Sequence, residues 1–261
     1  MIHGQVRLSI GGGDAHTADR GHSGSGCAVA AQAFRKCVAE DITGHVASAA
    51  LNPTAAQTCM MKDVPLPDRD FVSDAQARFD ALANYQVTLK STPAGAEPVE
   101  IRYGYRKPGF IRMDFIRPHP GATLTYSPAS GKVTLWPFGF GTFPRLMLSP
   151  DSRMIRSPQG HRVDESDIGA LLVNVRTLQL HGITQVVGAE SIGMCRATHV
   201  IVTCRPGHVA TGVFRYELWF DMSHGLPVKV ASEGASRKPI ETVLMEDLRI
   251  DVPGSQLRPF G

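Results

Sequence analysis

Residues 101–138 read IRYGYRKPGFIRMDFIRPHPGATLTYSPASGKVTLWPF, and this segment determines how the 261-residue chain folds. Its apolar and polar residues alternate, with Ile111, Met113 and Phe115 on one parity and Arg112 and Asp114 on the other. A period of two is typical of a β-strand that has one buried face. The segment therefore predicts several strands that each carry one apolar side.

Turns are predicted at three places rich in Pro and Gly, residues 107–109, 118–121 and 128–131. Both residue types favour turns, and such short connections make consecutive strands pair as antiparallel neighbours. Because strand side chains alternate between two faces, adjacent strands of this kind form a continuous apolar wall. Another layer of the protein or a ligand must cover that wall.

Two amphipathic helices are predicted. The first begins at Asp68 or Asp70 and ends near Asn84, because Asp is a good N-cap and the following apolar residues share one helical face. These residues are Val72, Ala75, Phe79 and Leu82. The second helix follows the acidic segment 164–167, which suits the positive end of a helix dipole. Its apolar residues are Ile168, Leu171, Leu172 and Val175.

Further strands are predicted over residues 85–92, 197–204, 213–222, 226–232 and 240–251. The expected fold is mainly β with some α: a curved, open antiparallel sheet, an incomplete barrel, with helices on its concave face. A closed barrel is the alternative. The open sheet is preferred because each helix is apolar on one stripe only, and that stripe must pack on a sheet face. We expect residues 67–261 to form this domain and residues 1–66 to be a poorly ordered or weakly helical extension.

Charge and composition argue against several classes of function. The net charge of +3 comes from scattered Arg and Lys without basic runs, so nucleic-acid binding is not expected. A hydrophobic fraction of 43% is ordinary for a globular chain. Residues 1–26 are rich in Gly, His, Ser and Asp, and they show no readable export signal.

Neither a metal site nor a catalytic site is predicted. The cysteines have no C-x-x-C pair and no histidine at zinc spacing. All five are expected to be free thiols: Cys27, Cys37, Cys59, Cys195 and Cys204. No G-x-S-x-G, P-loop or H-E-x-x-H motif occurs, and the ten histidines are dispersed. No catalytic residue and no cofactor are therefore predicted.

The order of short motifs along residues 68–251 resembles the LolA-like family, the periplasmic carriers of outer-membrane lipoproteins and their relatives. The motifs are ARFDAL (77–82), RKPGFIRM (106–113), LTY (124–126), GKVTLW (131–136), FD (220–221) and GLPVK (225–229). The resemblance implies a half-barrel whose apolar concave face, lidded by helices, takes the acyl chains of a lipid or lipoprotein. It also implies a location in the periplasm or cell envelope.

The resemblance supplies candidate site residues. The expected ligand-binding residues are Ile111, Met113, Phe115, Leu124, Tyr126, Phe214, Tyr216, Leu218 and Phe220. In the carrier an Arg stands before the Pro of the RKPG motif and helps to hold the lid, and the matching residue here is Lys107, which lacks the planar fork of Arg. Residues 138–147, with several Phe near Gly, are a candidate rim for lipid uptake, or a loop that packs on its own sheet.

Three functions are weighed. The first is non-enzymatic binding or transport of lipid or lipoprotein acyl chains by a monomer, with a membrane-bound donor or acceptor protein as a possible partner. The second is an envelope lipid sensor or interaction module. The third is a lipid hydrolase, which needs a Ser, a His and an acid to converge. The apolar residues of the candidate site are also compatible with an ordinary core, which uses the same residue types.

Overall fold

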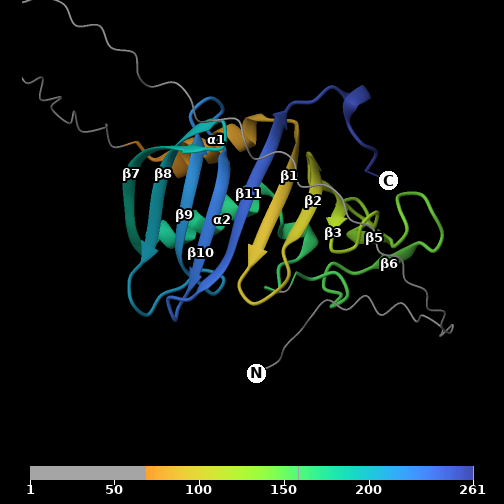
Figure 1. The fold of residues 1–261 in the computed structure, drawn as a ribbon, viewed down its shortest axis with the longest axis horizontal. Coiled ribbons are helices and arrows are strands. Elements are labelled where there is room, and N and C mark those ends of the chain that lie inside the picture. Colours follow the sequence, from red (N-terminus) through yellow and green to blue (C-terminus); the bar gives the residue numbers. More distant parts are fainter. Residues whose placement is uncertain (1–68, 158, 261) are drawn as a thin grey trace, which may run out of the picture. The chain divides into compact units, whose positions relative to one another are not determined.

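Eleven antiparallel strands form one open sheet in the computed structural model, which describes residues 69–157 and 159–260 (Figure 1). The strands are β1 (Asn84–Pro93), β2 (Val99–Arg106), β3 (Phe110–Arg117), β4 (Thr123–Ser127), β5 (Lys132–Trp136), β6 (Leu146–Leu148), β7 (Gly182–Ile192), β8 (Cys195–Cys204), β9 (Val213–Asp221), β10 (Pro227–Gly234) and β11 (Pro239–Ile250). Their order across the sheet is β6-β5-β4-β3-β2-β1-β11-β10-β9-β8-β7. The predicted open sheet is confirmed. The extension predicted for residues 1–66 lies outside the described residues.

Segment 101–138 forms most of β2 and all of β3, β4 and β5, and the predicted turns connect them. The pairing register places Tyr105 opposite Ile111, and Ile111 opposite Tyr126. Directly opposed residues of an antiparallel pair lie on the same face of the sheet, so the apolar face of each strand continues into the apolar face of its neighbour. The continuous apolar wall predicted from the alternation is therefore present.

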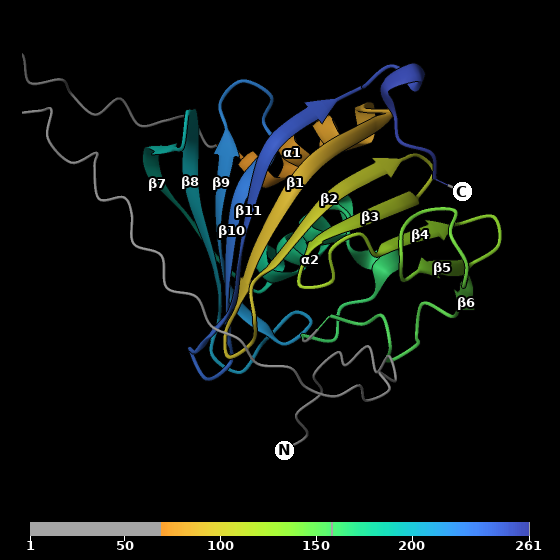
Figure 2. The ribbon, with the colours of Figure 1, turned by 45° about the vertical axis from the view of Figure 1, so that its right-hand side comes forward.

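Two helices lie on one face of the sheet, and the sheet curves around them (Figure 2). They are α1 (Phe71–Ala81) and α2 (Ile168–Leu180), as predicted. Asp70 caps α1 by accepting hydrogen bonds from the backbone N–H groups of Val72 and Ser73. Asp167 caps α2 by accepting one from Ala170. Two 3₁₀ turns, Val163–Glu165 and Gly254–Gln256, complete the described helical segments.

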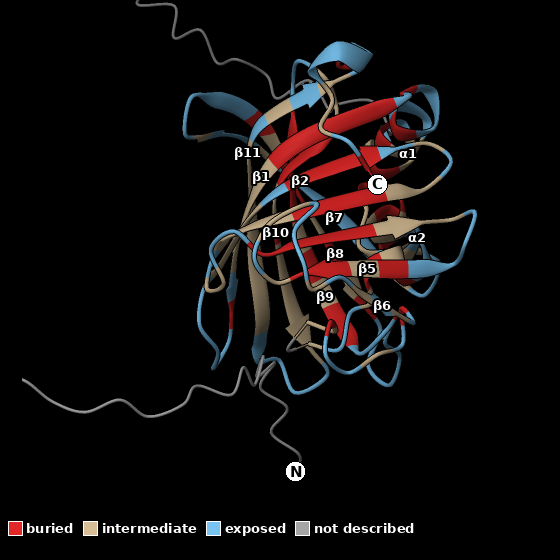
Figure 3. Cartoon of the chain, turned by 90° about the vertical axis from the view of Figure 1, so that its right-hand side faces the viewer, coloured by how far each residue is buried: buried red, intermediate tan, exposed pale blue. Residues whose placement is uncertain are grey.

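The two helices approach each other closely at Gly169. A Cβ atom at this position would lie 2.3 Å from Cε1 of Phe79, so any larger residue would force the Phe79 ring of α1 to move. Figure 3 shows that buried positions continue from the strands onto these helices. The main core therefore lies between the concave face of the sheet and the two helices.

The edge strands β6 and β7 were not predicted. β6 has three residues, which is too short for a periodic pattern. β7 has eleven, but most of them are exposed on both faces, and Gly188 and a register shift interrupt its pairing with β8. Because neither face is fully buried, no alternation of apolar and polar residues marks β7 in the sequence.

Candidate functional site

The concave face brings together all nine residues expected to bind a ligand. Seven are buried, Phe115 and Tyr126 are half-buried, and all nine belong to or pack against one apolar cluster. The cluster also contains the apolar stripes of α1 and α2. The helices thus cover the face on which an acyl chain was expected, and the nine residues are core residues in this state of the protein.

Apolar rows run across the strands of this face. In one half of the sheet Met113 lies between Tyr103 of β2 and Leu124 of β4. In the other half Leu218 lies between Val200 of β8 and Val230 of β10. β1 and β11 pair with each other and join the two halves. The concave layer is therefore continuous across the sheet.

Polar contacts hold the two helices mainly at their ends. Lys107 donates a hydrogen bond through Nζ to the carbonyl oxygen of Asp80, in the last turn of α1. Gln179 near the end of α2 donates to Asp70, the N-cap of α1, at 3.3 Å. It also donates to Thr184 of β7 at 3.1 Å. Lys107, predicted as the lid latch from the resemblance, therefore contacts α1 directly.

The start of α2 is bonded to buried tyrosines. The N–H of Ile168 donates to the hydroxyl of Tyr85 at 3.2 Å, and the hydroxyls of Tyr103 and Ser166 lie 3.3 Å apart. The rings of Tyr85, Tyr103 and Tyr105 stack, with centroids 5.3–5.8 Å apart. An aromatic and polar cluster therefore lies under the beginning of α2, within the otherwise apolar concave layer.

Burial sets the ionisation of these groups. It raises the pKa of Tyr85 and of Tyr103 well above their ordinary value, and it raises that of Tyr105 to about 12. Burial also raises the pKa of Asp167, although backbone hydrogen bonds from Ala170 and Gly169 oppose the shift. At neutral pH the tyrosines are uncharged, and burial disfavours the charged form of the Asp167 carboxyl that caps α2.

The candidate rim divides between packed and exposed aromatic residues. Phe140 packs on Trp136, with ring centroids 4.8 Å apart, and the guanidinium of Arg112 lies 4.2 Å from its ring centroid. Both partners lie on the convex face, so Phe140 packs on its own sheet. Phe138 and Phe143 are 61% and 91% exposed and are the free aromatic residues of this loop.

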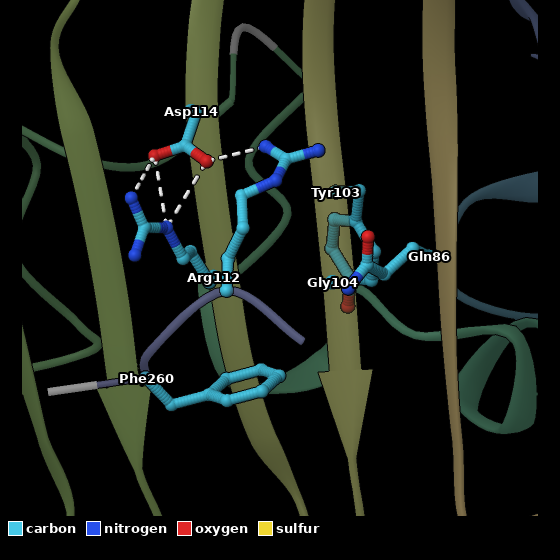
Figure 4. Close-up of a pocket in the computed structure, with 7 residues that line it drawn as sticks. Gln86, Tyr103, Gly104, Arg112, Asp114 and Phe260 are labelled. Carbon is cyan, nitrogen blue, oxygen red and sulfur yellow. Dashed lines mark hydrogen bonds and ion pairs between the residues drawn. The ribbon is translucent and has the colours of Figure 1, made fainter. Parts of the chain in front are cut away.

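The convex face carries a polar cluster that sequence reasoning missed (Figure 4). Arg112 forms hydrogen bonds and an ion pair with Asp114, two residues along β3, and donates to the carbonyl oxygen of Pro259 at 2.6 Å. Arg258 donates to Asp114 at 2.6 Å, and the ring of Phe260 lies against Gly104. The C-terminal segment after β11 is therefore pinned across β2 and β3. Residues separated by more than 140 positions meet here, and no local pattern signals them.

A second convex cluster surrounds His199 of β8. Its two ring nitrogens lie 2.9 Å from Glu190 and 3.1 Å from Glu217, and its ring stacks on Trp219 at 4.2 Å between centroids. The indole N–H of Trp219 donates to Glu190 at 2.8 Å, and the Lys229 ammonium lies over the indole ring. This cluster joins the exposed strand β7 to β8 and β9.

A serine, a histidine and an aspartate meet in the turn after β9. Ser223 donates its hydroxyl to Asp221, and the backbone N–H groups of Ser223 and His224 donate to the same carboxylate. Nδ1 of His224 accepts from the N–H of Leu226 at 3.2 Å. The serine hydroxyl is directed at the carboxylate and not at the imidazole, so these contacts are those of a turn and not of a hydrolytic triad.

Two further observations limit the chemistry of the described residues. Within ranges 69–157 and 159–260, no group of three or more His, Cys, Asp or Glu side chains is placed to hold a metal ion. In the same ranges, no helix has the length and apolar composition required to cross a membrane. Cys195 and Cys204 begin and end β8, and both are free thiols. The other three cysteines lie outside the described ranges.

No protein-family model matches the chain, and no curated protein matches it. Similar solved structures include the LolA superfamily protein from Nitrosomonas europaea, at 12% identity and a TM-score of 0.29, where the match covers 71% of this chain and 94% of that one. The lipoprotein LppX of Mycobacterium tuberculosis has 10% identity and a TM-score of 0.43, with 70% and 94% covered. A chain of the Pseudomonas aeruginosa MucA/MucB complex has 17% identity and a TM-score of 0.42, with 71% and 61% covered.

All three TM-scores lie below 0.5, and the sequence identities lie between 10% and 17%.

Proposed function

We propose that this protein binds the acyl chain of a lipid or lipoprotein on the concave face of its sheet, without catalysis, in the bacterial cell envelope. One observation carries the proposal: a continuous apolar layer is covered by two short helices, and their polar ties to the sheet lie mainly at their ends. Displacement of α1 or α2 would expose a trough lined by Ile111, Met113 and Leu218. Lys107 would then act as a latch that holds the end of α1.

The energies involved are compatible with an exchange of helix for ligand. Moving α1 off the sheet exposes Val72, Phe79 and Leu82, at a cost of roughly 1.5–3 kcal/mol for each side chain. An acyl chain of about 16 carbons gains roughly 0.8 kcal/mol for each buried methylene, or about 13 kcal/mol in all. The gain exceeds the cost, so one fully buried chain could replace α1 on the apolar layer.

An envelope protein-binding module is the second candidate, and the edge strand β7 favours it. Ile183, Val186 and Val187 are exposed on this strand, and Leu180 at the end of α2 is 80% exposed beside it. β7 pairs only with β8 within the described part of the chain, so one row of its backbone groups is open to an added strand. A partner protein could bind there while the concave face carries a lipid.

A photoreactive fatty acid tests the acyl-chain proposal. The full chain is delipidated, incubated with a diazirine-bearing fatty acid, irradiated and digested, and the labelled residues are identified by mass spectrometry. We expect labels on concave residues such as Met113, Tyr126 and Leu218. Labels confined to the exposed β7 edge or the convex face, or no saturable labelling, would contradict the proposal.

A matched pair of variants adds a second readout. Tyr126 and Ser127 are adjacent, half-buried residues of β4 whose side chains point to opposite faces of the sheet. Tyr126→Glu places a charge at the margin of the apolar layer and should reduce saturable labelling, whereas Ser127→Glu should leave it unchanged. Circular dichroism confirms that both variants remain folded. Equal labelling of the two variants would place the acyl chain elsewhere.

A further inference from the structure

Arg102 lies in a row of side chains on the convex face of the sheet. It is directly opposite Asp114 of β3 in the register, and Asp114 is directly opposite Thr123 of β4. Directly opposed side chains of an antiparallel pair lie about 4.5–5.5 Å apart at Cβ, within reach of an ion pair. Arg102 and Asp114 would therefore be expected to pair.

Other donors already occupy both oxygens of Asp114. Arg112 donates to both through Nε at 3.0 Å, Thr123 donates to Oδ1 at 2.9 Å, and Arg258 donates to Oδ2 at 2.6 Å. Burial would raise the pKa of this carboxyl, but the hydrogen bonds from the two arginines outweigh it and lower the pKa. The carboxylate stays ionised, and both of its oxygens are engaged in hydrogen bonds. Arg102, an exposed residue, forms no ion pair within 4.0 Å with any carboxylate in the described ranges.

The three guanidinium groups and Asp114 line one cleft. Its volume is about 480 Å³, and the turn between β3 and β4 forms its other wall. Thr123 also lines the cleft, and Pro120 and Gly121 belong to the wall at the turn. Three positive groups against one negative group leave a local charge of +2. Arg112 is engaged with Asp114 and Pro259, so Arg102 and Arg258 have donors left for a ligand.

We propose that this cleft binds a phosphate group, with Arg102 and Arg258 as its donors. A guanidinium carries five N–H donors in a planar fork that matches the oxygens of a phosphate. Arg258 belongs to the C-terminal segment, so the site is complete only while that segment is docked on β2 and β3. A lipid headgroup and free phosphate present the same chemistry. The proposal is independent of acyl-chain binding, because the proposed donors Arg102 and Arg258 lie on the opposite face of the sheet.

Titration of inorganic phosphate into the full chain, labelled with ¹⁵N in arginine, tests the site. We expect saturable shifts of the Nε–H signals of Arg102 and Arg258. Arg102→Gln should weaken phosphate binding about tenfold or more, because charge-assisted hydrogen bonds are lost. Arg102→Lys should have an intermediate effect, because it keeps the charge and loses the fork. Lys238→Gln removes an exposed charge from the β10–β11 turn and is the control.

Two outcomes of this titration would overturn the proposal. One is the absence of any saturable shift of Arg102 or Arg258 at low ionic strength in both phosphate and vesicle experiments. The other is an equal loss of binding in Arg102→Gln and Lys238→Gln, which would indicate attraction by net charge alone. Retained far-UV circular dichroism shows that each variant is folded.

Vesicles distinguish the two sources of phosphate. The full chain is mixed with vesicles of phosphatidylcholine alone or with phosphatidylglycerol added, and flotation measures the bound fraction. Binding that requires phosphatidylglycerol and is lost in Arg102→Gln supports a lipid headgroup as the ligand. Saturable phosphate shifts without such vesicle binding support a free phosphate compound.

Discussion

The two faces of the same strands are covered in different ways. On the concave face, α1 and α2 cover an apolar layer through side chains such as Phe79 and Leu172, and most of their polar ties lie at the helix ends. On the convex face, the C-terminal segment is held by ion pairs and hydrogen bonds to Arg112 and Asp114. An apolar contact can be replaced by any other apolar group, whereas a bonded ion pair needs a specific partner. The concave cover is therefore suited to exchange with a ligand, and the convex cover is suited to remain in place.

The largest expected effect comes from the concave layer. Leu218 is completely buried in the middle of β9, and Leu218→Ala should lower the free energy of unfolding by about 2–5 kcal/mol, because it removes buried methylenes and leaves a cavity. Val228→Ala is the convex comparison and should cost less, because it removes fewer atoms from a smaller cluster. Urea unfolding measures both. An equal loss in the two variants would contradict the view that the main core lies on the concave side.

The next effect concerns the tie between α2 and the sheet. Tyr85→Phe removes the hydroxyl that accepts from the N–H of Ile168 and leaves this buried donor without its partner. The expected loss in the free energy of unfolding is about 1–3 kcal/mol. Tyr105→Phe is the matched control, because Tyr105 is also buried and its hydroxyl has no hydrogen-bond partner among the described residues. Equal losses in chemical denaturation would show that the bond to α2 contributes nothing.

The two faces should also respond to pH with opposite sign. The pKa of Asp114 lies below its ordinary value of 3.8, so its stabilising contribution is present above that pH and is lost as pH falls through the lowered pKa. The pKa of Asp167 is raised, so its ionisation costs stability as pH rises from 3.8 through the raised pKa.

Asparagine variants isolate these two contributions. At neutral pH, Asp114→Asn should lower the free energy of unfolding, whereas Asp167→Asn should raise it, because Asn keeps the helix cap and removes the buried charge. The Asp114→Asn difference from the parent protein should shrink as pH falls below 3.8, whereas the Asp167→Asn difference should shrink as pH falls through the raised pKa toward 3.8. Thermal unfolding from pH 3 to 7 checks the signs, and two effects of the same sign would refute the contrast.

The smallest expected change in stability is at the latch. Lys107→Ala removes one solvent-accessible hydrogen bond to Asp80 and should alter the free energy of unfolding by about 0–1 kcal/mol. If Lys107 holds α1 over the acyl-chain site, the same variant should label faster with the photoreactive fatty acid. Lys132→Ala, on the exposed end of β5, serves as the control. An unchanged labelling rate would remove Lys107 from the lid.

Much of the concave face could be predicted from sequence because its signals are local. Asp70 and Asp167 mark the helix starts, and the alternation around Ile111 and Met113 marks the apolar side of β3. The convex face could not be predicted, because Asp114 and Arg258 are 144 positions apart in the sequence and meet only when the C-terminal segment folds back onto the sheet. The sequence left residues 138–147 as a candidate rim or a loop that packs on its own sheet, and the contacts of Phe140 with Trp136 and Arg112 on the convex face favour packing on the sheet for this residue.

The pairing of β1 with β11 has a consequence for synthesis of the protein. These are the first and last strands in the described part of the chain, and they lie side by side at the centre of the sheet. During translation, strands β1 to β6 can form a meander, but β1 keeps an open edge until β11 has left the ribosome. Contacts between such distant segments are slow to form, and exposed strand edges promote aggregation. A circular permutant that joins β11 directly to β1, with new termini between β6 and α2, would make the β1–β11 pairing local in sequence. It should therefore refold faster than the parent protein.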